Sequence, residues 1–184
     1  MTRPLPALGL LSSLFLLSSV PALSEDEAKA PAKNFSNAVV DIGIVVKDLE
    51  KSAAFYTEVL GLKEVNGFNV PAEKTTKFGL TDNQPAVVRV FVLDDTAGQP
   101  NTKLKIMAFP KAPGAEPDHE YIHSTLGLSY LTFFVTDMDR AVERLKKAKV
   151  KLLGETPAAL GGGNFLTTFH DPDGNFIELI GPSK

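Results

Sequence analysis

The sequence predicts an α+β fold in which two βαβββ modules pair to form a curved mixed sheet around one cleft. Each half of the chain opens with an apolar strand that leads into a helix capped by aspartate, first at Asp48 and again at Asp137. The caps are 137 − 48 = 89 residues apart, so the pattern occurs twice. After each helix, short apolar runs bounded by turn residues favour strands. The second half also carries the turn DPDGN, at residues 171–175, before its last strand.

The first module is expected over residues 38–110. Its opening strand is Val39–Val46, and Asp48 can cap the helix that follows by accepting hydrogen bonds from free N–H groups of the first turn. Gly61 is expected to end this helix, because glycine readily adopts the left-handed conformation of a helix stop. A loop rich in Asn, Pro and Thr is expected after the first of three further strands, at Leu62–Val65, Val87–Leu93 and Lys103–Phe109.

The second module is expected over residues 127–182, after a linker at 111–126. It repeats the order with a strand at Leu128–Thr136 and a helix after Asp137. A run of three glycines, 161–163, lacks the setting of a nucleotide-binding loop and is expected to form a flexible loop at the cleft rim. The remaining strands are expected at Val150–Leu153, Phe165–His170 and Asn175–Ile180.

Residues 1–22 have the pattern of a secretory signal peptide. Arg3 precedes an apolar run from Ala7 to Val20, and Val20-Pro21-Ala22 supplies small residues for cleavage. The run is shorter than the roughly 20 apolar residues of a membrane span, although an uncleaved anchor is the alternative. Residues 23–37 read as a flexible leader. We therefore expect a periplasmic or secreted protein with no membrane attachment after cleavage.

The composition limits the partners of the mature chain. Its 184 − 22 = 162 residues suffice for one domain with a substantial core. A net charge of −3 with mixed signs argues against nucleic acid as a partner. A small molecule bound in the cleft is the expected partner, and the sequence leaves open whether the modules pair within one chain or across a homodimer.

Two segments resemble the vicinal oxygen chelate (VOC) superfamily, together with the βαβββ–βαβββ order. They are DIGIVVKDLEKSAAFYTEVLGLKEV, at residues 41–65, and DPDGNFIELI, at residues 171–180. This superfamily includes lactoylglutathione lyase (glyoxalase), extradiol dioxygenases and the fosfomycin and bleomycin resistance proteins. The resemblance covers residues 38–182 and implies the paired-module fold, which hosts many different reactions.

The resemblance also implies four positions for a metal site. Metal-using relatives place His or Gln on the first strand of each half and Glu on the last strand, and these hold one Zn, Ni, Mn or Fe ion. Carried over, these positions fall on Asp41, Lys105, Tyr130 and Glu178. The resemblance therefore places Asp41 on the cleft face, although a solvated acid at the strand end is the alternative.

This set departs from the family pattern, because a protonated lysine cannot bind a metal and a neutral tyrosine is a poor ligand. We therefore expect no metal cofactor, and instead a polar network with Lys105 between Asp41 and Glu178 and the Tyr130 hydroxyl beside them. Glu178, Lys105 and Tyr130 become the candidate catalytic residues. The alternative is one divalent metal held by Asp41, Glu178 and a histidine.

Further candidates lie outside the four positions. Arg89 is expected in the cleft, where it would bind an anionic substrate; a surface arginine is the alternative. Asp41 is a further candidate for substrate binding. His170 is either an acid–base or substrate-binding group at the cleft rim or a partner of the neighbouring turn. His119 and His123 would share one face of a helix and could bind metal there, but a solvated linker is the favoured interpretation.

The sequence thus predicts an exported protein that binds a small anionic or carbonyl-bearing molecule without the usual metal site. It would act as a binding or sequestering protein or as a metal-free enzyme. The alternative is a metal-dependent enzyme, either a glyoxalase-like lyase or isomerase or a dioxygenase.

Overall fold

Residues 35–37, 39–93 and 101–184 are described by the structure, which is a computed structural model. The expected signal peptide and almost all of the leader lie outside the described residues. Within the described ranges, no helix has both the length and the apolar character needed to cross a membrane.

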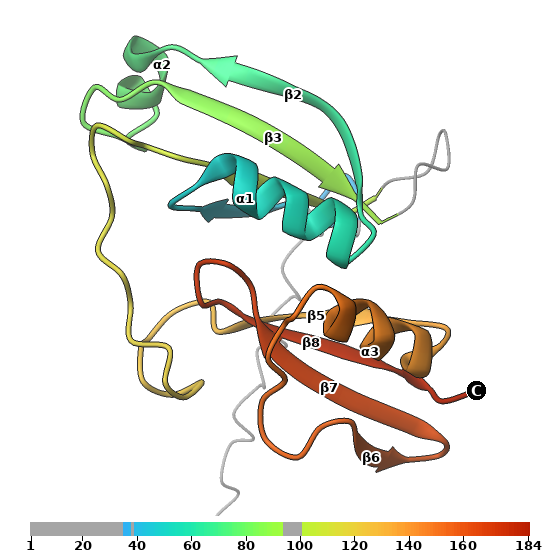
Figure 1. Cartoon of the computed structure of the whole chain (residues 1–184). Helices are drawn as coiled ribbons and strands as arrows, with labels where there is room; N and C mark the ends of the chain where they lie inside the picture. Colours follow the sequence, from blue (N-terminus) through green and yellow to red (C-terminus); the bar gives the residue numbers. More distant parts are fainter. Residues whose placement is uncertain (1–34, 38, 94–100) are drawn as a thin grey trace, which may run out of the picture. The chain divides into compact units, whose positions relative to one another are not determined.

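The first module is a mixed four-stranded sheet, sheet A, with the strand order β1-β4-β3-β2 (Figure 1). β1 pairs with β4 in parallel, and the other pairs are antiparallel. Asp48 caps the helix as predicted by accepting hydrogen bonds from the backbone N–H groups of Glu50 and Lys51. Gly61, at φ 81°, follows the helix. The elements are β1 (Ile42–Val45), α1 (Leu49–Ala54), the π-helical turn η1 (Phe55–Val59), β2 (Lys63–Val70), α2 (Ala72–Lys77), β3 (Ala86–Val92) and β4 (Lys103–Met107).

The segment after β2 is more ordered than the loop that we expected from its composition. α2 forms there, and β2 itself extends well beyond the expected Leu62–Val65. The buried hydroxyl of Thr75 in α2 donates a 2.6 Å hydrogen bond to the carbonyl of Gln84. This bond ties the helix to the chain that leads into β3.

The second module is sheet B, with the strand order β5-β8-β7-β6. The strand expected at Val150–Leu153 is reduced to a single bridge between Leu152 and Phe169. The fourth strand forms further along the chain, and the three glycines make the tight turn that joins it to the next strand, with φ between 60° and 91°. The prediction of a flexible rim loop at these glycines is therefore wrong. The elements are β5 (Tyr130–Phe134), α3 (Met138–Lys147), β6 (Ala158–Gly161), β7 (Asn164–His170) and β8 (Phe176–Pro182).

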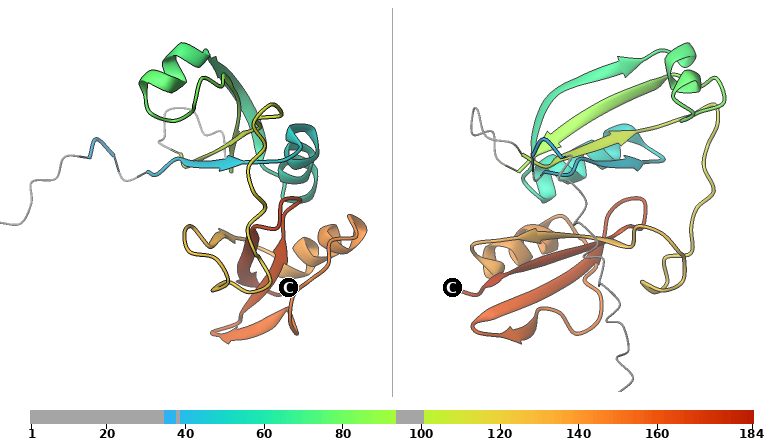
Figure 2. Two further views of the ribbon diagram at one scale, coloured as in Figure 1. Left: turned by 90° about the vertical axis from the view of Figure 1, so that its left-hand side faces the viewer. Right: turned by 180° about the vertical axis from the view of Figure 1, so that it is seen from behind.

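The two modules confirm the predicted α+β architecture, as two mixed four-stranded sheets each accompanied by a helix (Figures 1 and 2). The helix-covered sides of both modules contribute to one hydrophobic core. Phe91 and Ile106 of sheet A and Phe169 and Ile177 of sheet B are all fully buried in it. Each sheet therefore has a core side and an opposite side, which we call its helix-free face.

Hydrogen bonds join the modules where the 171–175 turn meets α1. The Ser52 hydroxyl and the backbone N–H of Lys47 both donate to the Asp173 carboxylate, each at 2.7 Å. The Tyr56 hydroxyl donates to Asp171 Oδ2 at 2.7 Å. Gly174 completes this turn at φ 88°, a conformation that favours glycine. The packing thus fixes the turn against the helix of the first module.

Candidate functional site on the helix-free faces

Strand register decides which residues lie on the helix-free face of sheet A. Leu104 and Ile106 are buried in the core, so Lys105 and Met107 of the same strand point to the other side. This alternation agrees with the sequence prediction. Cross-strand partners share a face, and the register therefore adds Val45, Val65, Phe68, Val88, Val90 and Lys103.

An ion pair lies on this face, at the two first-module positions that the resemblance implies for metal ligands. The Lys105 ammonium is 2.7 Å from Asp41 Oδ2, and the two side chains are 28% and 36% exposed. The backbone N–H of Lys103 also donates to Asp41, at 3.3 Å. The hydrogen bond from Lys105 is the main reason why the pKa of Asp41 lies below its usual range. Asp41 is thus a partner of a fixed cation.

The helix-free face of sheet B carries Glu178. Ile177 and Leu179 are buried in the core, so Glu178 points away from it, beside Thr132 of the neighbouring strand. The Thr132 hydroxyl donates a 2.7 Å hydrogen bond to Glu178 Oε2. Thr132 was not among the residues predicted from the sequence, although it lies two residues after Tyr130 and therefore on the same face. Tyr130 is 47% exposed.

The structure brings together one part of the predicted network. Lys105 contacts Asp41, whereas Glu178 contacts Thr132. Within the described ranges, no hydrogen bond or ion pair joins Lys105 or Asp41 to Glu178 or Tyr130. The two polar pairs therefore lie on the faces of separate sheets.

Arg89 does not lie where the sequence analysis placed it. Its register partner is Ile106, so it is on the core side of sheet A. Its guanidinium makes two 2.7 Å hydrogen bonds to Glu64 and one of 2.8 Å to Glu50 of α1. The prediction of Arg89 in the cleft is therefore wrong. The reason is that β3 is apolar on both faces, so alternation alone could not show which face is covered by the helix.

His170 lies at the end of β7, where its ring meets Phe176 edge-on at 4.4 Å between ring centres. Its Nε2 atom is buried and has no hydrogen-bond partner among the described residues. Burial lowers the pKa of His170, and the nearby His119 and Lys151 lower it further. The neutral imidazole is thus favoured at this position.

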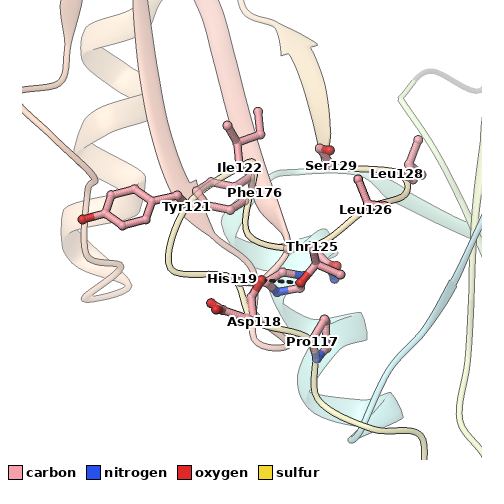
Figure 3. Close-up of a pocket in the computed structure, with 11 residues that line it drawn as sticks. Pro117, Asp118, His119, Tyr121, Ile122, Thr125, Leu126, Leu128, Ser129 and Phe176 are labelled. Carbon is pink, nitrogen blue, oxygen red and sulfur yellow. Dashed lines mark hydrogen bonds between the residues drawn. The ribbon is translucent and has the colours of Figure 1, made fainter.

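The other two histidines do not share a helical face, because the segment around them forms turns and no helix. His123 stacks on Tyr121, with 5.5 Å between ring centres. His119 lies against Phe176, where linker residues fold over β8 and leave a hollow of about 200 Å3 (Figure 3). A second hollow, of about 380 Å3, lies between the proline-rich part of the linker and residues Val45 and Phe109.

The residues at the positions that the resemblance implies for metal ligands do not fit the usual metal site. One position is an ammonium already bonded to the carboxylate beside it, and another is a tyrosine. Elsewhere in the described ranges, no three His, Asp or Glu side chains come together in an arrangement suited to a metal ion. The donor set thus favours a fixed cation over a bound one.

Comparison with known proteins agrees with this fold. A lactoylglutathione lyase from Pseudomonas putida is 28% identical over 178 residues, which cover 93% of this chain and 98% of that enzyme. The crystal structure of a glyoxalase family protein from Bacillus cereus superposes with a TM-score of 0.68 at 26% identity, over 84% of this chain and 100% of that one. A fosfomycin resistance protein from Listeria monocytogenes shares the fold, with a TM-score of 0.50 at 18% identity, over 81% and 96% of the two chains.

The family match spans both modules. The Glyoxalase/Bleomycin resistance protein/Dioxygenase superfamily matches residues 38–179, from the strand that precedes α1 to the last strand of sheet B. The chain therefore belongs to the Glyoxalase/Bleomycin resistance protein/Dioxygenase superfamily.

Proposed function

We propose that this protein is an exported member of the superfamily that binds a small anionic or carbonyl-bearing molecule without the usual four-ligand metal. The observation that carries the proposal is the 2.7 Å ion pair between Lys105 and Asp41. An ammonium held on the helix-free face can donate hydrogen bonds to a carboxylate or carbonyl oxygen of a ligand. Charge-assisted hydrogen bonds of this kind are stronger than neutral ones.

The binding surface is completed, in this proposal, by a second copy of the chain. The helix-covered sides of both modules already share a core within one chain, and the Lys105 and Glu178 positions do not meet there. β1 and β5 are edge strands of their sheets, and an edge strand is a ready template for pairing with another chain. A homodimer that places sheet A beside the partner's sheet B would bring the two polar pairs to one cleft.

Export is part of the proposal and rests on residues 1–22 alone. The mature protein from its native host is expected to begin near Leu23 or Glu25. Sequencing of its N-terminus would overturn export if Met1 were intact.

A metal-dependent lyase is the second candidate, because the relative from Pseudomonas putida is a lactoylglutathione lyase that matches nearly the whole chain. In that case Asp41, Glu178 and a histidine would hold one divalent ion. A dioxygenase is a further possibility within this second candidate, since the superfamily includes that reaction.

One set of measurements on the mature chain separates the candidates. Calorimetry with pyruvate, lactate, methylglyoxal and S-lactoylglutathione measures binding, and elemental analysis measures metal content. We expect saturable binding that weakens in Lys105→Met, with no stoichiometric metal and no lyase turnover that depends on added metal. Light scattering of the same sample measures its molar mass and so tests whether the chain forms the proposed dimer. A purified chain that binds none of these compounds would overturn the binding proposal.

A further inference from the structure

The side chains around Lys105 indicate the kind of ligand that this face would bind. This inference rests on the proposed function. On the helix-free face of sheet A, charge is concentrated at one end of the strands. Among the described residues, Lys103 and Lys105 flank Asp41 there, and the pairing of Lys63 with Val92 places Lys63 on the same face. Lys105 and Lys103 both lower the pKa of Asp41, so the carboxylate stays ionised beside them.

The rest of the same face is apolar. Val88 and Val90 form a small hydrophobic cluster, and Val65, Met107 and Phe109 pack against it. Accessible apolar surface surrounds this cluster, because Val45 is 54% exposed and Phe68 is 47% exposed. Single exposed apolar residues are ordinary on a protein surface, but a group of them beside one charged pair is a feature of ligand sites.

The apolar surface continues into a hollow. Met107 lies two residues after Lys105 in β4, and Phe109 lies just beyond the end of this strand. Val45 is the register partner of Met107. Val45 and Phe109 both line the hollow of about 380 Å3 under Pro110 and Pro113 of the linker.

We propose that the ligand is an amphiphilic monoanion, with a carboxylate at Lys103 and Lys105 and an apolar tail that runs past Met107 toward the hollow at Val45 and Phe109. A carboxylate there would accept charge-assisted hydrogen bonds from the two ammonium groups. The tail covers side chains that are otherwise in contact with water. A peptide conjugate such as S-lactoylglutathione fits this face poorly, because its several charges and amides would lie against Val45, Phe68 and Met107.

The test is calorimetry of the mature chain with four probes: butanoate, octanoate, 1-octanol and S-lactoylglutathione. Burial of each added methylene favours binding, so octanoate should bind at least about tenfold more tightly than butanoate. Octanoate should also bind more tightly than 1-octanol, which has the tail without the charge. Equal affinities for butanoate and octanoate, or a preference for 1-octanol or S-lactoylglutathione, would overturn the inference.

Variants assign the two parts of the ligand to the two parts of the face. The double substitution Asp41→Asn with Lys105→Met removes the ion pair and leaves Lys103, so it should reduce the preference for octanoate over 1-octanol. Val45→Gln should reduce the ratio between octanoate and butanoate. Lys77→Met, at an exposed lysine of α2, is the matched control and should change neither ratio.

The outcomes also distinguish this inference from the proposed function. If pyruvate or methylglyoxal binds in a Lys105-dependent way while chain length has no effect, the inference fails and the proposed function stands. If none of the carboxylates and carbonyl compounds binds, both fail. Thermal melts of every variant establish that a lost preference is not lost folding.

Discussion

The Tyr56 hydroxyl donates a 2.7 Å hydrogen bond to Asp171 Oδ2 across the interface between the modules. Tyr56 is fully buried, and Asp171 is 5% exposed. The other donors to this carboxylate are the backbone N–H groups of Asp173 and Asn175 and the Asn175 side chain. Burial, and then the neighbouring Asp171 carboxylate, raise the pKa of Tyr56 well above its usual range, so the phenol remains a donor.

Removal of this hydroxyl should destabilise the chain without affecting the binding surface. Tyr56→Phe leaves the buried carboxylate with one donor fewer, and an incompletely paired buried group costs about 1–3 kcal/mol. Urea unfolding measures the loss. Tyr121→Phe, at a tyrosine that is 57% exposed, is the control and should be close to neutral. Equal stability of the two variants would show that the Tyr56 contact does not hold the modules together.

Local sequence patterns predicted the parts of this structure that depend on local forces. Asp48 and Asp137 cap their helices because the cap is made with the next few N–H groups. The face of Lys105 followed from its apolar neighbours Leu104 and Ile106. β6 was missed because all of its residues are exposed and show no alternation.

The relation between Lys105 and Glu178 could not be predicted in the same way. Each residue was placed on the correct face of its own strand, but their separation depends on how the two modules pack. That packing is set by contacts far apart in sequence, such as Tyr56 with Asp171. Arg89 shows the related difficulty of a strand that is apolar on both faces.

Glu178→Gln should change ligand binding while it leaves the fold intact. The glutamine carbonyl can still accept the hydrogen bond from Thr132, but the negative charge is removed. Calorimetry with octanoate and pyruvate measures the effect, and Glu143→Gln, on the exposed side of α3, is the control. Binding identical to wild type would remove Glu178 from the ligand site.

Leu179, the next residue of β8, should respond in the opposite way. It is 2% exposed and packs in the core shared by the modules. Leu179→Ala should therefore lower the free energy of unfolding by about 2–5 kcal/mol. Urea unfolding measures this loss, and ligand affinity of the folded fraction should be unchanged. A loss of unfolding free energy as small as that of a surface substitution, about 0.5 kcal/mol, would contradict the burial of this strand.

Stability should fall as the pH is lowered from about 7 to 5, and His170 should account for part of the loss. Its pKa is lowered in the folded state, mainly by burial, so the unfolded chain binds a proton more readily. Stability is therefore lost below the ordinary histidine pKa of about 6.5, and this loss levels off below the folded-state value.

Thermal melts across this range of pH check the assignment to His170. His170→Gln should flatten the pH dependence, whereas His123→Gln, at an exposed histidine, should not. Asp41 and Glu64 do not interfere, because their lowered pKa values place their contributions at more acidic pH. Identical pH profiles for His170→Gln and wild type would contradict this assignment.

The last prediction concerns the cation itself. The resemblance to metal-using relatives implies a glutamate at the position of Lys105, and the Lys105 ammonium lies 2.7 Å from Asp41. Lys105→Glu replaces this cation with a second carboxylate beside Asp41. The two negative charges repel each other, and a divalent ion relieves the repulsion because carboxylate oxygens are good ligands for it. Lys105→Glu should therefore melt at a lower temperature than wild type in the presence of chelator, and Zn, Ni or Mn should raise its melting temperature. Wild type and Lys77→Glu, which adds the same charge far from Asp41, should show little specific change with these metals. A wild-type protein that retains one tightly bound transition metal, and loses it in Asp41→Ala or Glu178→Ala, would reverse the argument, because Lys105 would then be a neighbour of the metal and not its replacement.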